Sequence, residues 1–358
     1  MRTSEALIDR LVEWLRASRL FPDKNLHVDL IVNPQAGALL HSRRARKLLA
    51  ILEGAHRRRG EHSPRRPVRV AVWTTEFPGH EKQILSHLAT SDPLGPGDLR
   101  LVVTAGGDGT SRGTLISALS LDPSLLERTL FFRLPLGTGN DAADSPDWSA
   151  ALEVLGGGND QVGVRPLPLI EVRTPGQPVH FSFNIASLGL DAFVSDLTNR
   201  LKAWFPGNSY SLMVDLATLF YESFVRVVPA TLELTKGRQV SLRWTDAFLL
   251  AALGTTGRKT YGAGKKILPD HDNFCLAGRQ NLFEKLGLRT PFYQGTHRGR
   301  PGIHLASGDT LTVSSPVRLP LQMDGEVLWL EPSDFPLTMT IVDRGVKVLS
   351  LAGSGNLA

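Results

Sequence analysis

Short apolar runs alternate with segments of helical spacing along the first part of the chain. The runs cover residues 28–32, 68–73, 101–103 and 130–134, and the segments between them cover 43–59, 81–89 and 113–119. Each run is rich in Val, Leu, Ile or Phe and ends in small or polar residues, as buried strands do. Strand and helix in repeated alternation predict an α/β domain with a parallel sheet. In such sheets ligands bind beyond the carboxyl ends of the strands, so we expect the chemistry in the loops there.

The N-terminal segment, residues 4–20, has the spacing of an amphipathic helix. Leu7, Leu11 and Leu15 recur at helical intervals with charged residues between them. We expect this helix to pack on its own domain, and a helix that lies on a membrane surface or binds a partner stays open as the alternative.

The pattern changes after the glycines at 156–158. From Leu167 to Val317, short segments of alternating polar and apolar residues predict an antiparallel sandwich or barrel. These segments are 169–172, 180–184, 230–234, 240–244, 248–253 and 311–313, with one helix expected over 209–224. The predicted fold class is therefore α/β plus β, with a parallel-sheet domain over 1–160 and an antiparallel β-sandwich over 161–334. The C-terminal segment, about 335–358, is a candidate to pack back on the first domain.

The composition is that of a globular protein, since 42% of the 358 residues are hydrophobic and 21% are charged. Cys275 is the only cysteine, which excludes an internal disulfide and favours the cytoplasm. No apolar run approaches the roughly 18 residues that a membrane-spanning helix needs.

The net charge of +5 is unevenly distributed. Between His41 and Val70 the chain has ten basic and two acidic residues, so this segment carries +8 and the remainder carries −3. The basic residues are Arg43, Arg44, Arg46, Lys47, Arg57, Arg58, Arg59, Arg65, Arg66 and Arg69. Such a segment fits an anionic membrane, a nucleic acid or an acidic partner, and a solvated helix face is the plainer alternative.

A glycine-rich string, Gly106-Gly107-Asp108-Gly109-Thr110, directly follows the third apolar run. Glycines let the backbone turn tightly and bring its N–H groups against phosphate oxygens. A helix that begins after the string adds its positive N-terminal end. Asp108 would repel phosphates unless it binds a metal or takes a proton, so we interpret it as functional. A glycine turn with a helix-capping aspartate is the competing interpretation.

A second loop of this kind, Pro135-Leu136-Gly137-Thr138-Gly139-Asn140-Asp141, follows the fourth run. It combines two glycines with hydroxyl, amide and carboxylate side chains. Two such loops at successive strand ends predict a phosphate-binding site.

These motifs, in this order, resemble those of the diacylglycerol kinase catalytic-domain superfamily, which includes diacylglycerol, sphingosine and ceramide kinases. The matching landmarks are Asn33-Pro34…Gly37, Thr75 before Glu76, Gly106–Thr110, Gly137–Asp141, Asn184…Gly189, Gly262–Gly264, Pro269…Asp272 and Asp324-Gly325-Glu326. NAD kinases and phosphofructokinases share the glycine–aspartate string. The second loop and the late Asp-Gly-Glu are typical of the lipid-kinase branch.

The resemblance implies that ATP binds at the strand ends of an NAD kinase/diacylglycerol kinase-like first domain, and that the second domain receives a lipid acceptor. The residues implied at the nucleotide are Asn33, Pro34, Gly37, Thr75, Gly106, Gly107, Gly109, Thr110, Gly137, Thr138, Gly139 and Asn140. It assigns Glu326 as proton acceptor for the attacking hydroxyl and places Asp324 in the same site; with Asp108 these are our catalytic candidates. Carboxylates of this kind can deprotonate a hydroxyl or hold Mg²⁺, which bridges phosphate oxygens.

The sequence departs from the family pattern at several positions. Asp272 matches an aspartate that helps build a structural Mg²⁺ site, but the glycine that usually follows is Asn273 here. Ala36 replaces a serine, and Arg112-Gly113 stands where many members have Asn-Glu. These changes bear on nucleotide affinity or acceptor choice and leave the candidate carboxylates in place.

The leading hypothesis is an ATP- and Mg²⁺-dependent kinase of a lipid hydroxyl, with diacylglycerol as the default acceptor. A sphingoid base or ceramide, and a soluble acceptor such as NAD, are alternative acceptors. A nucleotide-binding or nucleic-acid-binding module is the alternative without catalysis, and the strand-end loops argue against nucleic acid. We expect a cytoplasmic protein that reaches anionic membranes reversibly through the Arg43–Arg69 segment.

Overall fold

The computed structural model describes residues 3–59, 66, 68–137, 140–141, 143–157, 162–201, 220–261 and 264–351. The chain divides into two compact units. Among the described residues, unit 1 comprises the chain up to Leu167 together with the chain from Asp343 to Leu351, and unit 2 comprises Pro168–Val342. The chain thus leaves unit 1 once and comes back to it near the C-terminus.

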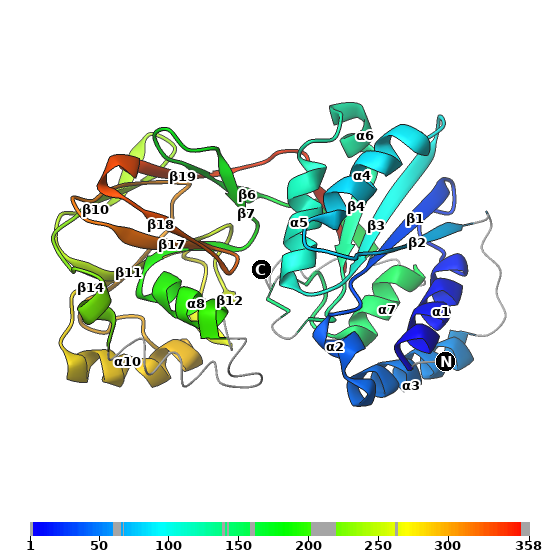
Figure 1. The fold of residues 1–358 in the computed structure, drawn as a ribbon, viewed down its shortest axis with the longest axis horizontal. Coiled ribbons are helices and arrows are strands. Elements are labelled where there is room, and N and C mark those ends of the chain that lie inside the picture. Colours follow the sequence, from blue (N-terminus) through cyan, green and yellow to red (C-terminus); the bar gives the residue numbers. More distant parts are fainter. Residues whose placement is uncertain are drawn as a thin grey trace. The chain divides into compact units, whose positions relative to one another are not determined.

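Unit 1 contains a six-stranded sheet in the order β2-β1-β3-β4-β20-β5 (Figure 1). Its strands are β1 (Asn25–Val32), β2 (Arg69–Thr74), β3 (Asp98–Ala105), β4 (Thr129–Arg133), β5 (Val162–Pro166) and β20 (Lys347–Leu351). The pairs from β2 through to β20 are parallel, and the register sets Val32 beside both Thr74 and Ala105. The first strands therefore end level with one another. The predicted parallel α/β sheet is confirmed.

Helices cover both faces of this sheet. They are α1 (Thr3–Arg16), α2 (Gly37–Leu40), α3 (Ser42–Arg59), α4 (His80–Ser91), α5 (Asp108–Ala118), α6 (Pro123–Glu127) and α7 (Trp148–Gly156). Helices α1, α3 and α7 pack together on one face, and α4 and α5 pack together on the other (Figure 1). The strands are buried on both sides, which explains their nearly continuous apolar runs.

The unit boundary differs from the expected one at 160. Strand β5 pairs antiparallel with β20, so the chain stays in unit 1 until Leu167. At the other end, only part of the segment 335–358 returns, because β19 (Leu337–Val342) pairs with strands of unit 2. Strand β20 pairs parallel with β4. The hydrogen-bonded partner decides to which sheet a short strand belongs, and a partner distant in sequence leaves no local pattern.

Helix α1 buries its apolar face inside unit 1. Leu7, Leu11 and Leu15 are fully buried, and Trp14 donates through Nε1 to the carbonyl of Leu152 at 3.0 Å. Arg59 at the end of α3 lies over the Trp14 ring, 4.5 Å from its centroid. This packing confirms the expectation that the helix serves its own domain.

The basic segment is only partly described, because residues 60–65 and 67 lie outside the described residues. On α3 the side chains of Arg43, Arg44 and Arg46 are exposed. Arg59 differs, since its guanidinium donates to the carbonyls of Ala17 and Gly156. Arg59 therefore joins α3 to the neighbouring elements, and the exposed arginines are the ones free to meet an external anion.

Unit 2 is an antiparallel sandwich of two six-stranded sheets, β10-β9-β16-β19-β6-β7 and β15-β14-β11-β8-β17-β18, as expected. Their bounds are β6 (Leu169–Arg173), β7 (His180–Ser182), β8 (Ile185–Gly189), β9 (Thr231–Lys236), β10 (Gln239–Trp244), β11 (Phe248–Gly254), β14 (Phe274–Gly278), β15 (Ile303–Ala306), β16 (Thr310–Ser314), β17 (Leu319–Met323), β18 (Glu326–Leu330) and β19 (Leu337–Val342). Alternate residues of both sheets meet in one core, for example Leu232 and Leu311 from one and Leu188 and Leu321 from the other.

Two further helices of unit 2 lie beside the second sheet, α8 (Leu190–Leu201) and α10 (Leu282–Gln294), together with the small hairpin of β12 (Lys259–Tyr261) and β13 (Lys265–Leu268) (Figure 1). Most of the helix expected over 209–224 lies outside the described residues, and its last part, 220–224, is helical. Among the helices of the described ranges, none combines the length and the apolar composition needed to cross a membrane.

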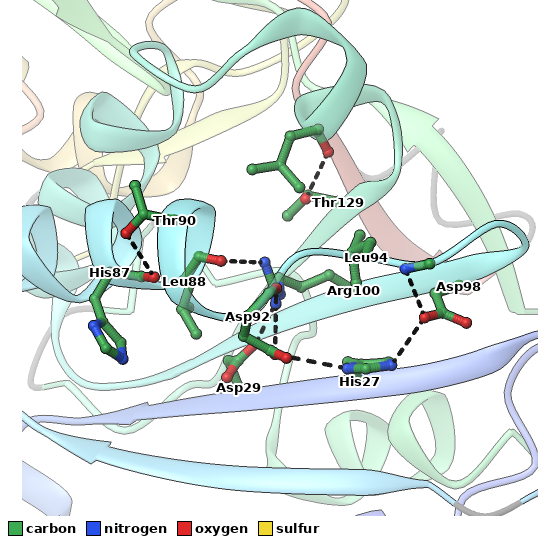
Figure 2. Close-up of polar contacts among 12 residues, drawn as sticks. His27, Asp29, His87, Leu88, Thr90, Asp92, Leu94, Asp98, Arg100 and Thr129 are labelled. Atoms are coloured by element: carbon green, nitrogen blue, oxygen red, sulfur yellow. Dashed lines mark hydrogen bonds and ion pairs between the residues drawn. The ribbon is translucent and has the colours of Figure 1, made fainter.

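A buried ion pair connects strands β1 and β3 of unit 1 (Figure 2). Arg100 places Nε 3.0 Å from Oδ2 of Asp29, and both side chains are at most 3% exposed. The same guanidinium donates to the carbonyls of Leu88 and Asp92, at 3.1 and 2.7 Å. Trp73 on β2 donates to the other oxygen of Asp29 at 2.9 Å. This buried ion pair thus joins strands β1, β2 and β3 and the end of α4.

His27 extends this cluster along β1. Its ring lies between two carboxylates, with Nδ1 3.7 Å from Asp92 and Nε2 3.4 Å from Asp98. Asp98 also accepts from Asn25 and from the backbone N–H of Gly95. The cluster lies on the α4 side of the sheet and toward the amino ends of β1 and β3, away from the carboxyl ends where the predicted loops lie.

We expect Arg100→Met to lower the free energy of unfolding by about 3–5 kcal/mol at neutral pH, because it leaves the buried Asp29 carboxylate without its cation. Burial already raises the pKa of Asp29, and Arg100 opposes that rise. Without Arg100 the pKa rises further, so the folded state gains relative stability as the pH falls and Asp29 takes up a proton. Urea unfolding at several pH values measures both effects.

The control for this prediction is the double variant Asp29→Asn with Arg100→Met. It removes both charges and keeps a group that can accept from Trp73, so it should lose less stability than Arg100→Met alone and depend less on pH. With Asp29→Asn measured as well, a loss in the double variant equal to the sum of the two single losses would show that the pair contributes no coupling energy.

Candidate active site

The loops after β1 and β3 meet through side chains and backbone. Asn33 donates through Nδ2 to the Thr110 hydroxyl at 2.8 Å, and its backbone N–H donates to the carbonyl of Ala105 at 3.0 Å. Thr75, after β2, donates through its backbone N–H to the carbonyl of Val32 at 2.8 Å. Three of the predicted nucleotide residues are therefore brought together at one edge of the sheet, from positions far apart in sequence.

The glycine string leads directly from β3 into α5, which begins at Asp108. A Cβ on Gly106 would lie 2.7 Å from the Thr110 side chain, so only glycine fits here. Gly107 occupies the N-cap position without a side chain to cap the helix. The first turn of α5 thus presents backbone N–H groups, and the helix dipole favours an anion there. A Cβ on Gly109 would meet nothing within 4 Å, so this glycine borders open space.

The loop after β4 lies against the glycine string. A Cβ on Gly137 would approach the Cα of Gly107 to 2.9 Å, which requires a glycine at 137. The carbonyl of Leu136 accepts from the backbone N–H of Ala38. This loop therefore also contacts α2, which begins at Gly37, shortly after Pro34. Thr138 and Gly139 lie outside the described residues, and Asn140 adopts a left-handed backbone with φ of 60°. The predicted loops of unit 1 thus form one continuous surface.

Asp324 in unit 2 has a carboxylate that is fully used by hydrogen bonds. Oδ1 accepts from the Ser182 hydroxyl at 2.7 Å and from the backbone N–H groups of Asn184 and Ile185 at 3.0 and 3.2 Å. Oδ2 accepts from the backbone N–H of Phe183 at 2.6 Å. Asp324 therefore holds the link between β7 and β8, a positioning role that the sequence did not indicate.

Glu326 has a different environment although it lies two positions further on. It begins β18, opposite Met323 in the hairpin, and its side chain is exposed. Within the described ranges no hydrogen bond or ion pair engages its carboxylate. Asp108, in unit 1, is half-buried at the start of α5. Of the two late carboxylates, Glu326 is the one available to accept a proton.

Asp272 does not fit the structural Mg²⁺ site that the resemblance implies. Its carboxylate accepts from the Ser307 hydroxyl at 2.8 Å and from the guanidinium of Arg298, which also binds Asp270. A guanidinium thus supplies the positive charge at this pair of aspartates. In the part of the chain that the structure describes, no group of three or more His, Cys, Asp or Glu side chains could hold a metal ion.

A pocket in unit 2 was not predicted from the sequence. Its apolar lining comes from α8, β11, β13 and α10, through Leu190, Val194, Leu250, Ile267, Leu288 and Phe292. Two buried charges lie in its wall: Asp191 and Lys265, whose Oδ1 and Nζ are 4.0 Å apart. Burial raises the pKa of Asp191, while the ammonium of Lys265 opposes the rise. Lys265 follows the Gly262–Gly264 landmark and Asp191 follows Asn184…Gly189, but nothing in either stretch of sequence indicated an apolar pocket.

A chain of hydrogen bonds links the pocket to the turn that precedes Glu326. Asp191 accepts from the Ser187 hydroxyl at 2.7 Å, and Gln322 donates to Ser187 at 2.8 Å. The carbonyl oxygen of the Gln322 side chain accepts from the backbone N–H of Gly325 at 3.0 Å. Gln322 also donates to Asp191 directly at 3.4 Å, so this one buried side chain joins the charged wall of the pocket to the Asp324-Gly325-Glu326 turn.

Comparison with known proteins relates residues 27–160 to a known catalytic domain. The diacylglycerol kinase catalytic domain matches residues 27–160. A solved structure of a diacylglycerol kinase from Bacillus anthracis str. Sterne aligns with a TM-score of 0.54 at 15% identity, covering 92% of this chain and 98% of that one. A further structure from the same organism, provisionally named a diacylglycerol kinase, gives 0.58 at 16% identity with the same coverage. No curated protein matches the sequence.

The structural similarities establish the two-domain fold, and the domain match covers the loops described above. Residues 27–160 are therefore similar to the catalytic domain of the diacylglycerol kinase superfamily.

Proposed function

We propose that this protein is an ATP-dependent lipid kinase that transfers the γ-phosphoryl group to a lipid hydroxyl, diacylglycerol-type by default. The family supports a kinase phosphotransferase that uses a nucleotide. The observation that carries the proposal is the convergence of the glycine string and the Gly137 loop, which brings Gly107 and Gly137 into contact at the N-terminus of α5. Such a surface fits nucleotide phosphates.

In phosphoryl transfer the protein mainly positions the reactants and neutralises charge. Unit 1 has groups that can do both. Backbone N–H groups of α5 would hold phosphate oxygens, while Asn33, Thr75 and Thr110 border the same surface. Mg²⁺ bound with the nucleotide would neutralise the phosphates, and Asp108 is the carboxylate of this surface that fits a metal ligand. ATP is the nucleotide that we assign on these grounds.

The pocket of unit 2 supports a lipid as the acceptor. Its lining is mainly aliphatic and aromatic, which suits a hydrocarbon chain. Its charged wall is joined through Gln322 to the turn before Glu326. An acceptor whose chain fills the pocket and whose hydroxyl lies near that turn would find Glu326 available as general base.

Membrane attraction through the Arg43–Arg69 segment is part of the proposal. Basic residues near an anionic bilayer contribute roughly 1 kcal/mol each. The exposed arginines of α3 support this role, whereas Arg59 is engaged within unit 1. Binding to anionic vesicles should weaken with salt and with Arg43→Ala and Arg44→Ala.

The direct test is a transfer assay with purified protein, Mg²⁺ and γ-labelled ATP. Diacylglycerol, sphingosine and ceramide in mixed micelles, and NAD in solution, are supplied as separate acceptors. Labelled lipid is the expected product. Transfer to NAD alone would contradict the lipid assignment, and transfer to none of them would contradict the proposed function as a whole.

Replacement of Glu326 by Gln should lower kcat by at least about a hundredfold and leave the thermal midpoint unchanged, because Glu326 is exposed and removal of a general base costs that much. Steady-state kinetics and thermal unfolding measure the two effects. Asp324→Asn should instead lower the unfolding free energy by about 1–3 kcal/mol, because its carboxylate accepts four hydrogen bonds.

The matched control is Glu153→Gln, which changes an exposed glutamate of α7 and should alter neither quantity. Wild-type turnover in Glu326→Gln would remove Glu326 from the mechanism. An unchanged midpoint in Asp324→Asn would contradict its positioning role.

A single methyl group tests the phosphate surface. Gly109→Ala should stabilise α5 by up to about 1 kcal/mol, because alanine is the better helix former and its Cβ meets no protein atom within 4 Å. The same methyl group would occupy space that phosphate oxygens need, so the Kd for Mg·ATP should rise at least about tenfold. Calorimetry measures the binding, and thermal unfolding measures the stability.

The control is Gly287→Ala on α10, another helical glycine whose Cβ would meet nothing within 4 Å. It should gain similar stability and bind Mg·ATP as the wild type does. Unchanged binding in Gly109→Ala would show that phosphates do not approach the start of α5.

A further inference from the structure

The first turns of α10 expose an unusual set of apolar side chains. Phe283 is 85% exposed, and Leu282 and Leu286 are more than 40% exposed. These three lie on one side of the helix, while Lys285 and Leu288 point into unit 2. A large aromatic side chain so fully exposed contributes nothing to the fold and suggests an external apolar partner.

A second exposed apolar pair lies on the neighbouring segment. Phe220 and Phe224 are 51% and 71% exposed, and Phe224 stacks on Phe193 of α8. Glu222, between them, pairs with Lys285 of α10. The two segments are therefore adjacent in unit 2, and each carries exposed aromatic side chains.

The charge around α10 favours an anionic partner. Between residues 279 and 289 the chain has three basic residues and one acidic residue, and one of the basic residues, Lys285, is buried and paired with Glu222, so Arg279 and Arg289 are the exposed cations of this stretch. Arg279 is exposed just before α10, and Arg289 is exposed on α10 while it also lines the unit 2 pocket, whereas Glu284 is used in the capping box with Asn281. Exposed aromatic and aliphatic residues flanked by arginines are typical of helices that lie in the interface of an anionic bilayer.

The same helix forms a wall of the apolar pocket. Leu288, Arg289 and Phe292 of α10 line it from one side. A bilayer in contact with the outer side of α10 would be continuous with an apolar pocket directly behind that helix. A protein partner would not require an apolar pocket directly behind the helix that it binds. We therefore assign a lipid surface.

We propose that the first turns of α10, with Leu282, Phe283 and Leu286, form a docking surface that inserts into the interface of an anionic lipid bilayer and sets the unit 2 pocket against it. This surface is distinct from the basic segment of α3. The inference rests on the proposed function for the identity of the lipid that enters the pocket, while the docking itself requires no transfer.

The chain offers a clean site for a fluorescent probe. Cys275 is the only cysteine, it is fully buried, and burial raises the pKa of its thiol, so it should not react with thiol reagents under native conditions. An environment-sensitive fluorophore attached to Phe283→Cys therefore reports on one position. The same label on Val240→Cys, an exposed position of β10, is the matched control.

Mixed phosphatidylcholine and phosphatidylglycerol vesicles should shift the emission of the label at 283 to the blue and leave the label at 240 unchanged. Phosphatidylcholine vesicles alone should give a smaller response. In flotation, Phe283→Glu with Leu286→Glu should lower binding to the mixed vesicles at least about tenfold, and Val240→Glu should have no effect.

Three outcomes would overturn the inference: no shift at 283 with vesicles, equal shifts at 283 and 240, or a shift at 283 that follows protein concentration without lipid. The last would identify the surface as an interface between two copies of the chain. Vesicle docking through α10 without any transfer to lipid would contradict the proposed function alone, and transfer to micellar lipid without docking at 283 would contradict this inference alone.

Discussion

The sheet of unit 1 depends on a strand, β20, that follows unit 2 in the chain. Strand β20 lies between β4 and β5, and without it β4 would have a partner on one side only. Leu349 of β20 is fully buried in the same core as Leu7 of the first helix. Because the Gly137 loop follows β4, the position of the proposed phosphate surface also depends on this late pairing. Unit 1 cannot complete its core until all of unit 2 has left the ribosome.

Much of this architecture could be predicted from local patterns. The apolar runs ending at Val32 and Leu134, and the glycine string after Ala105, indicated strands and strand-end loops within a few residues of where they lie. Local patterns could not predict pairings between strands that are distant in sequence, such as that of β5 with β20. Helix α10 was also missed because Pro291 lies inside it, although Asn281 and Glu284 form a capping box that was readable in the sequence.

The candidate site shows a similar division between residue type and environment. Asp324 and Glu326 belong to one motif, yet one carboxylate accepts four hydrogen bonds and the other is exposed without any in the described ranges. Asp191, outside every motif, is a buried carboxylate in the wall of a pocket. In unit 1 the sequence predicted loops that the structure brings together, because backbone and glycine define that surface. In unit 2, where side-chain packing defines it, only the structure separates the positioning residue from the available base.

The buried pair of Asp29 and Arg100 has a consequence for how this sequence can change over time. Replacement of Arg100 alone leaves the buried Asp29 carboxylate without its cation and removes the donor to the carbonyls of Leu88 and Asp92. Replacement of Asp29 alone leaves Arg100 paired only with Asp92 and removes the acceptor of Trp73. Two apolar residues in their place could be equally stable, but the path to them crosses a costly intermediate. Positions 29 and 100 should therefore vary together or not at all among relatives of this protein. Such covariation would reflect the stability of the fold and not a role in catalysis.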